Sequence, residues 1–262
     1  MDFECRIKKN ETLKSGYRRI VFDAPEIAAQ AQGGQFVHVR ITPMRDRLLR
    51  RPFSISYTDP AAGELTVVYK VVGHGTFELA QMHTGETCRI LGPLGNAYTP
   101  PTADVFPILA AGGYGAAALY LIAKNASRKG ILLLGARTKD DLILTEDFER
   151  LGFEVRIATN DGSAGHRGFV TELLDGALSG QERSKCMIYG CGPTPMLLAL
   201  GKLSMEKQVR AEISLDQHMC CGVGACFACV VKIKDPSSPD GWRYSRSCKE
   251  GPVYNATEVY YG

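Results

Sequence analysis

The first hundred residues show a pattern of short alternating segments. Apolar and polar residues alternate in residues 35–41, 53–57 and 65–72, as they do in strands with one buried face. Turns rich in glycine and proline separate these segments. Many short strands joined by such turns predict a small antiparallel β-barrel, which we assign to residues 1–100.

From about residue 104 the pattern changes to apolar strands that alternate with helices. The predicted strands are 105–110, 131–134, 154–158 and 185–189. Helices are predicted over 116–126, which is rich in alanine and leucine, and through Met196 and Leu200. This alternation predicts an α/β domain over residues 101–211, built on a parallel sheet with both faces covered. A small C-terminal domain over 212–262 would then hold five of the nine cysteines, which gives a multidomain chain.

Composition and charge narrow the class of protein. With 262 residues, 45% hydrophobic and 23% charged, the chain is long enough for several globular domains and is too apolar to be disordered. A net charge of +3 without a basic cluster argues against nucleic acid as a partner. The charged start Met1–Arg6 does not resemble a signal peptide. The uncharged segment 105–123 contains Pro107 and several glycines, so we expect a strand, a turn and a helix there, no membrane span and a cytoplasmic location.

The cysteine spacing gives the strongest chemical signal. Cys221, Cys226 and Cys229 form C-x4-C-x2-C, with Cys248 downstream, which is the plant-type [2Fe–2S] ligand spacing. The intervening glycines and alanines let the loop aim backbone N–H groups at sulfur. A four-cysteine zinc site and a set of free thiols are the alternatives, although zinc sites usually show C-x2-C pairs at both ends. Cys220 is one residue out of register, so we predict that it is not a ligand.

A glycine-rich turn indicates a nucleotide site in the second domain. Gly112, Gly113 and Gly115 follow an apolar strand and open a helix, where a backbone without side chains can approach a pyrophosphate. The pattern is not the full G-x-G-x-x-G, and a plain structural turn is the alternative. The second strand ends in Gly135-Ala136-Arg137, with no acidic residue to hold a ribose, so NAD and NADP both stay open.

Arg51-Pro52-Phe53-Ser54 resembles the flavin-binding R-x-Y-S motif of the ferredoxin–NADP reductase superfamily. The resemblance implies that Arg51 pairs with the FAD pyrophosphate, that Phe53 packs near the flavin, and that Ser54 hydrogen-bonds toward its reactive edge. Phe53 lacks the hydroxyl of the usual tyrosine. Two further segments match the next flavin-contacting segments of that superfamily, and a third matches the one that closes over the nicotinamide. In that order they are Val68-Tyr69-Lys70, Gly75-Thr76 and Cys191-Gly192-Pro193.

The order of the modules extends the resemblance over nearly the whole chain. Flavin barrel, nicotinamide domain and C-terminal cluster resemble the electron-transfer subunits of class 1B dihydroorotate dehydrogenase, the PyrK family. Asn160–Ser163, the run Ser214–Val231 and Cys248–Val253 are among the closest segments. The resemblance implies the cofactors FAD, [2Fe–2S] and NAD.

The same resemblance implies a partner and a direction for the electrons. A catalytic subunit with its own FMN would deliver electrons through the cluster and FAD to NAD⁺ during pyrimidine (UMP) synthesis, in a heterotetramer of two of each subunit. Flavin must stand between the other two cofactors, because nicotinamide exchanges hydride and a cluster exchanges single electrons. Hydride transfer between FAD and NAD needs no acid or base, so we assign no catalytic residue. We expect the surface around Phe227 to dock the partner.

Two other functions remain compatible with these residues. A small flavin and iron–sulfur subunit of another oxidoreductase, of the NADH-dependent ferredoxin:NADP oxidoreductase or sulfhydrogenase γ type, would share the internal chemistry and differ in its partner. A non-enzymatic redox sensor or zinc-stabilised binding module would have lost flavin chemistry. An absorption spectrum separates the second alternative from the enzymes.

Overall fold

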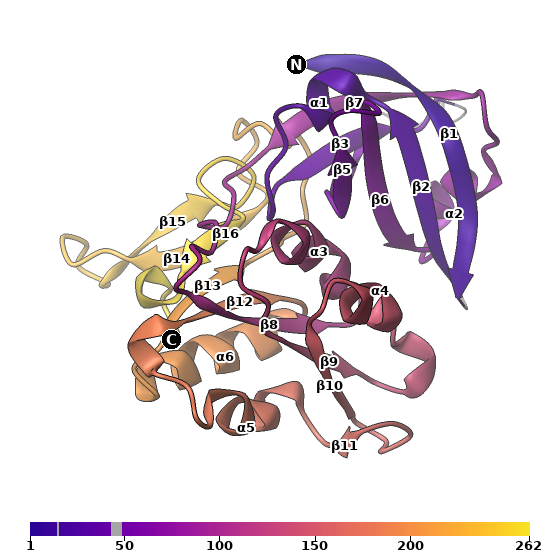
Figure 1. The fold of residues 1–262 in the computed structure, drawn as a ribbon. Helices are drawn as coiled ribbons and strands as arrows, with labels where there is room; N and C mark the ends of the chain where they lie inside the picture. The colour runs from indigo at the N-terminus through magenta and orange to yellow at the C-terminus, as the bar shows by residue number, and fades with distance from the viewer. Residues whose placement is uncertain (15, 43–48) are drawn as a thin grey trace.

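A curved antiparallel sheet forms the N-terminal part of the chain. The computed structural model describes residues 1–14, 16–42 and 49–262 (Figure 1). The strands are β1 (Asp2–Lys14), β2 (Tyr17–Asp23), β3 (Phe36–Arg40), β4 (Arg51–Ser54), β5 (Tyr57–Asp59), β6 (Glu64–Lys70) and β7 (Thr87–Leu94), in the order β4-β3-β7-β1-β2-β6-β5. Two short helices, α1 (Pro25–Ala28) and α2 (His74–Gln81), accompany them.

The sheet curls so that β4 and β6 contact each other across the barrel. The rings of Phe53 on β4 and Tyr69 on β6 lie 5.6 Å apart. The expected strand 53–57 is broken here. The N–H of Ile55 bonds to the carbonyl before β3, and the N–H of Ser56 bonds to a carbonyl of β6. The chain thus passes from one edge of the sheet to the other, which separates β4 from β5 and closes the barrel.

The second sheet is parallel except at one edge. Its strands are β8 (Phe106–Gly112), β9 (Ile131–Ala136), β10 (Glu154–Thr159), β11 (His166–Arg167), β12 (Cys186–Cys191), β13 (Arg210–Ser214) and β16 (Val253–Asn255), in the order β11-β10-β9-β8-β12-β13-β16. Only β16 is antiparallel to its neighbour. In Figure 1, α3 (Gly115–Asn125) and α4 (Thr145–Arg150) cover one face, and α5 (Leu174–Leu178) and α6 (Thr194–Glu206) cover the other.

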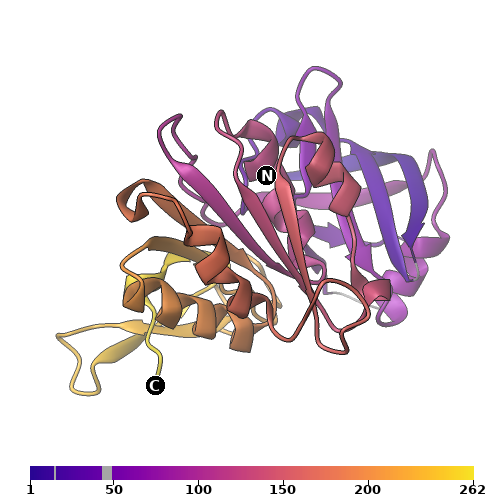
Figure 2. The same cartoon turned by 60° about the horizontal axis from the view of Figure 1, so that its bottom comes forward.

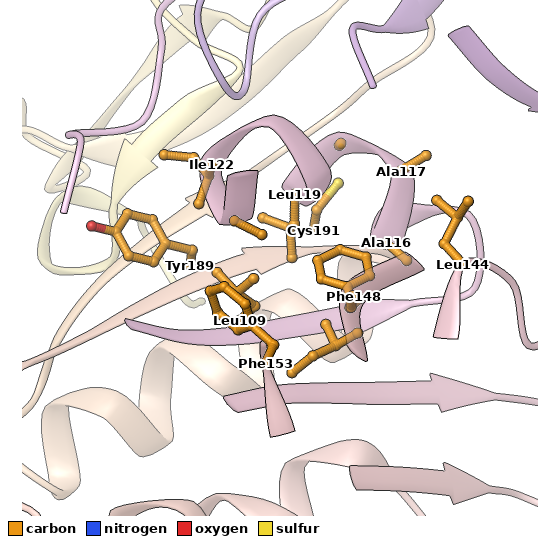
Figure 3. Close-up of a cluster of buried hydrophobic side chains, with 14 of the residues drawn as sticks. Leu109, Ala116, Ala117, Leu119, Ile122, Leu144, Phe148, Phe153, Tyr189 and Cys191 are labelled. Carbon is orange, nitrogen blue, oxygen red and sulfur yellow. The ribbon is translucent and has the colours of Figure 1, made fainter. Parts of the chain in front are cut away.

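Two hydrophobic cores follow from the alternation of side chains along these strands. On β8, Leu109 belongs to the core beneath α3 and α4, and Ile108 belongs to the core beneath α5 and α6. Figure 3 shows the first core, in which Leu109, Phe148 and Tyr189 pack below α3. Both faces are apolar because both are covered, as expected for a parallel sheet. Among the described residues, no helix has the length and apolar character needed to cross a membrane.

The C-terminal segment joins the other two parts. A hairpin of β14 (Val230–Lys234) and β15 (Trp242–Arg246) projects from the molecule in both views (Figures 1 and 2). Beside it, Met219, Cys229 and Cys248 form a small buried cluster with Phe36 of β3. The cysteine-bearing loop is therefore packed on the barrel, while β16 returns the chain to the parallel sheet.

Candidate functional site

The four predicted ligand cysteines lie in one loop region and differ in exposure. Cys229 and Cys248 are buried, Cys221 is partly buried and Cys226 is exposed. Backbone N–H groups point at three of the sulfur atoms. The Sγ of Cys221 accepts from Val223 and Ala225 at 3.5 and 3.3 Å, that of Cys248 from Gly224 at 3.2 Å, and that of Cys229 from Cys248 at 3.4 Å. Donors of this kind stabilise thiolates and cluster sulfur.

These four thiols also interact in two pairs. Burial raises the pKa of Cys221, but hydrogen bonds from the Val223 backbone and from Cys226 outweigh burial and lower that pKa to about 6. For Cys248, burial and then a hydrogen bond with Cys229 raise the pKa to about 12.

The pairing is a test of which metal group the thiols could hold. Within the described residues, no three His, Cys, Asp or Glu side chains converge on a single ion. Two pairs of thiols fit the two-by-two ligation of two irons better than the single tetrahedral centre of zinc.

The cysteine loop packs directly against a strand of the barrel. A Cβ added to Gly222 would lie 2.7 Å from both Cε1 and Nδ1 of His38 on β3, so the loop backbone rests on that ring. Gly222 also has φ +71°, which favours glycine. Phe36, on the same side of β3, packs with Cys229 and Cys248. Its ring meets the His38 ring edge-on at 5.8 Å.

The predicted pyrophosphate segments meet at the start of α2. A Cβ on Gly75 would lie 2.7 Å from Nε of Arg51, so the guanidinium lies against the first turn of α2. The Thr76 hydroxyl accepts from the N–H groups of Val72 and Gly73 at 2.9 and 3.1 Å, which fixes the turn that precedes the helix. A helix N-terminus beside an arginine can hold a diphosphate.

Some side chains of the other predicted flavin segments are buried in the hydrophobic cores, and others point out of them. Tyr69 is buried in the barrel core against Phe53, which leaves its backbone as the part that a cofactor could reach. Lys70 points the other way, and its Nζ lies 2.6 Å from Oδ1 of Asp141. Pro52 pairs with His38, and Ser54 pairs with Phe36, along the β3–β4 ladder. Val68 is buried in the core beneath α3.

The two predicted nicotinamide segments interlock at the carboxyl ends of β8 and β12. A Cβ on Gly115 would lie 2.2 Å from the carbonyl oxygen of Cys191, and one on Gly112 would lie 2.5 Å from Cδ of Pro193. A Cβ on Gly192 would in turn lie 2.9 Å from the Cα of Gly112. This close approach therefore requires glycine. The Cys191 thiol lies in the core below α3 (Figure 3), and burial raises its pKa to about 12, so it is no nucleophile.

A cavity of about 750 Å³ opens beside these loops. Gly112, Gly113 and Pro193 line one side, and Tyr17 and Lys70 of the barrel line another. Such a volume at the ends of parallel strands is typical of a nucleotide site. The cavity is therefore shared between the barrel and the α/β domain.

Three residues of these candidate sites were not predicted from the sequence. Tyr17 and Asp141 line the cavity, and they are joined by a 3.1 Å hydrogen bond between parts of the chain that lie far apart in sequence. His38 is completely buried, and among the described residues neither ring nitrogen has a hydrogen-bond partner. Burial, and then the charge of Arg50, lower its pKa to about 4. Within an alternating strand, His38 carried no signal that another segment covers it.

The fold is that of the ferredoxin reductases, with an FAD-binding barrel, a parallel α/β sheet and an added C-terminal iron–sulfur domain. Residues 4–98 match the oxidoreductase FAD-binding domain, and residues 216–260 match the iron–sulfur cluster binding domain of dihydroorotate dehydrogenase B. The electron transfer subunit of dihydroorotate dehydrogenase B (NAD⁺) from Geobacillus sp. strain WCH70 is 41% identical, covering 97% of this chain and 94% of its own. That from Fusobacterium nucleatum is 34% identical over 98% and 97%. The chain belongs to this family of electron transfer subunits.

Solved structures support the same fold. A chain from the NADH-dependent reduced ferredoxin–NADP oxidoreductase structure has a TM-score of 0.83 and 30% identity, covering 98% of this chain and 90% of that one. The ferredoxin reductase of carbazole 1,9a-dioxygenase has a TM-score of 0.67 at 21% identity, covering 80% and 66%, and it supports the fold alone. The expected fold class, the family, and the flavin and iron–sulfur domains are thus confirmed.

Proposed function

We propose that this chain passes electrons between NAD and a catalytic partner subunit, using FAD and a [2Fe–2S] cluster held by Cys221, Cys226, Cys229 and Cys248. When bound, the nicotinamide exchanges hydride, the cluster exchanges single electrons, and the flavin does both. The protein contributes binding and orientation, and no side chain is required to move a proton.

Arg51 and the first turn of α2 would hold the FAD diphosphate. The guanidinium fork matches phosphate oxygens, and the N–H groups at the start of α2 add favourable dipoles. Gly75 permits the approach because any side chain there would displace Arg51. Ser54, at the end of the β4 strand that begins with Arg51, would direct its hydroxyl toward the flavin.

The cavity beside Gly112 and Pro193 would hold NAD. Gly112 and Gly113 leave backbone free for the pyrophosphate, and Pro193 lines the same cavity. Lys70 of the barrel faces this cavity, so the flavin and nicotinamide segments border one space.

The pairing of β3 with β4 is the main support for electron transfer between the flavin and the cluster. Ser54 of the flavin motif pairs with Phe36, and Phe36 packs with Cys229 and Cys248. A single strand therefore stands between the flavin motif and two of the ligand cysteines. That arrangement supports direct electron exchange between the two cofactors within one chain.

The outer side of the cysteine loop would dock the partner. Val223 and Phe227 are 50% and 60% exposed, and Cys226 is exposed beside them. Exposed apolar side chains around a redox group are suited to contact with another protein. We propose an FMN-containing dihydroorotate dehydrogenase subunit as that partner, in a heterotetramer of two of each. We propose a cytoplasmic location, where cysteines serve metals more often than disulfides.

The test is an anaerobic titration of the chain purified with that catalytic subunit. Dihydroorotate should bleach the flavin and iron–sulfur absorption together, and added NAD⁺ should restore both while NADH appears. The parallel assay with NADP⁺ measures the nicotinamide preference. If NADH reduces the chain but dihydroorotate does not, and reduced ferredoxin does, the function is that of the ferredoxin:NADP oxidoreductase type, and the proposed partner is wrong.

A further inference from the structure

The least explained polar group in the described part of the chain is the side chain of His38. The side chain is 0% exposed. Its two ring nitrogens, Nδ1 and Nε2, are buried and have no hydrogen-bond partner among the described residues. Leaving a buried donor without an acceptor destabilises the folded protein. Such a group in a folded protein calls for a partner that the polypeptide itself does not supply.

The surroundings of His38 restrict where that partner can be. On the same side of β3, Phe36 fills the space toward Cys229 and Cys248. The edge of the ring that carries Cε1 and Nδ1 faces Gly222, which directly follows Cys221. The hydrogen-bond acceptors to be expected on this side of the loop are the sulfur atoms of the iron–sulfur site.

We propose that the His38 ring N–H donates a hydrogen bond to a sulfur of the [2Fe–2S] site and raises the reduction potential of the cluster. This inference rests on the cluster ligation proposed above. The other donors to these sulfur atoms are backbone N–H groups of the loop and of Cys248. His38 would be the donor that comes from the flavin barrel.

The sign of the effect follows from charge. Reduction adds an electron to the cluster, and a donor to sulfur stabilises the more negative state. An imidazole ring carries at least one N–H in either protonation state, so His38 has a donor for this bond. The link would also tie the orientation of the cluster loop to β3, next to the flavin motif.

The decisive measurement uses the full-length chain labelled with ¹⁵N-histidine and reduced anaerobically. Pulsed EPR of the reduced cluster should show a ¹⁵N coupling from histidine. The chain has five histidines, of which His218 lies near the cluster loop in sequence. His218→Gln should therefore keep the coupling, and His38→Gln should abolish it. A coupling lost in His218→Gln instead would overturn the assignment.

A potentiometric titration gives an independent readout. In His38→Leu, the ratio of reduced to oxidised cluster at a fixed potential should fall roughly tenfold, the effect of losing one hydrogen bond to a charged group. The FAD potential should not change, and His38→Gln, which keeps an N–H donor, should recover part of the shift. A shift in the flavin alone, or an unchanged cluster potential with full iron content, would contradict the inference.

The two proposals fail in different ways. Absence of any reduced-cluster EPR signal in the wild-type chain would refute the cluster ligation, and the role of His38 with it. A normal signal without a histidine coupling would refute only the role of His38. If His38→Leu cannot be purified, the labelled wild-type chain and His218→Gln still decide the question.

Discussion

The neighbouring cysteines 220 and 221 differ in the groups that surround their sulfur atoms. Two backbone N–H groups donate to Cys221. Among the described residues, no backbone N–H is directed at Cys220. Such donors stabilise a thiolate, and Cys221 is the ligand that the C-x4-C-x2-C spacing predicts.

We expect Cys221→Ser to lose the iron–sulfur absorption and most of the bound iron while it retains FAD. The matched control Cys220→Ser should keep the cluster, because it removes no predicted ligand. Iron analysis and visible spectra of both anaerobically purified variants measure the difference. Loss of the iron–sulfur absorption and iron in Cys220→Ser, with both kept in Cys221→Ser, would reverse the assignment.

For individual residues, the sequence indicated which side chains could do chemistry better than it indicated which residues would surround them. The cysteine ligands and Arg51 could be proposed because their spacing or motif carries the chemical requirement. His38 could not, because in an alternating strand a polar residue opposite Val37 and Val39 is expected to face solvent. Its burial depends on Gly222, nearly two hundred residues later, and no local pattern records such a contact.

At the scale of elements, α3 is fixed to the sheet through a glycine at its first residue. The Cβ of an alanine at position 115 would lie 2.2 Å from the carbonyl oxygen of Cys191, and this backbone cannot move without moving β12. Gly176 in α5 provides the contrast, because an added Cβ would lie 3.2 Å from the flexible end of Arg156.

Gly115→Ala should therefore lower the free energy of unfolding by about 1–3 kcal/mol, the usual cost of overpacking a close contact. It should also weaken NADH binding, since Pro193, two residues after Cys191, lines the cavity proposed for NAD. Gly176→Ala should be neutral or stabilising by up to about 1 kcal/mol, because alanine is the better helix former. Thermal denaturation and NADH titration measure both variants. Equal stability of the two variants would contradict this account.

Elements with a clear pattern of apolar residues could be predicted from the sequence. The break between strands that closes the barrel could not. The parallel strands β8, β9, β10 and β12 have apolar sequences because both faces are covered, and the sequence predicts all four. The segment 53–57 was predicted as one strand. It is two, because Ile55 and Ser56 bond to opposite edges of the barrel. Barrel closure depends on hydrogen bonds between segments that are distant in the sequence, so the residue pattern within one segment does not predict it.

At the scale of the whole molecule, Lys70 of the barrel and Asp141 of the α/β domain form a contact across the cavity. The hydrogen bond from Lys70 lowers the pKa of Asp141 from its ordinary 3.8, and the same bond raises the pKa of Lys70 from 10.5. Because the pKa of Asp141 is lowered, the contribution of Asp141 to the free energy of unfolding is complete above pH 3.8 and is lost as the pH falls further. The raised pKa of Lys70 means that its contribution is complete below pH 10.5 and is lost above it.

Asp141→Asn should therefore reduce stability by less than about 1 kcal/mol between these limits, because both side chains are partly exposed. The loss should disappear when the wild-type carboxyl is itself protonated. The neighbouring Asp140→Asn, whose side chain is exposed, serves as control. Urea unfolding at pH 7 and at pH 3.5 tests the sign. A deficit that is larger at pH 3.5 than at pH 7 would exclude this ion pair as its cause.

Phe227, on the surface proposed to dock the partner, combines a strained backbone with an exposed side chain. Its φ of +58° places a bulky residue in the left-handed region, which costs about 1–3 kcal/mol. Its ring stays 60% exposed, with the Arg246 guanidinium 5.1 Å from its centre. A strained and exposed aromatic side chain gains little within the isolated chain, so its gain should come from contact with another molecule.

Phe227→Gly separates these two effects. Glycine relieves the strained backbone, so the isolated chain should be as stable as wild type or more so. Association with the catalytic subunit should weaken at least about tenfold, as for an aromatic side chain at the centre of an interface. Phe77→Ala, with a similarly exposed aromatic residue on α2, should leave association unchanged. Thermal unfolding of the variant and its affinity for the partner by calorimetry test both parts. A less stable Phe227→Gly chain with unchanged affinity would mean that Phe227 supports the cluster loop rather than the interface.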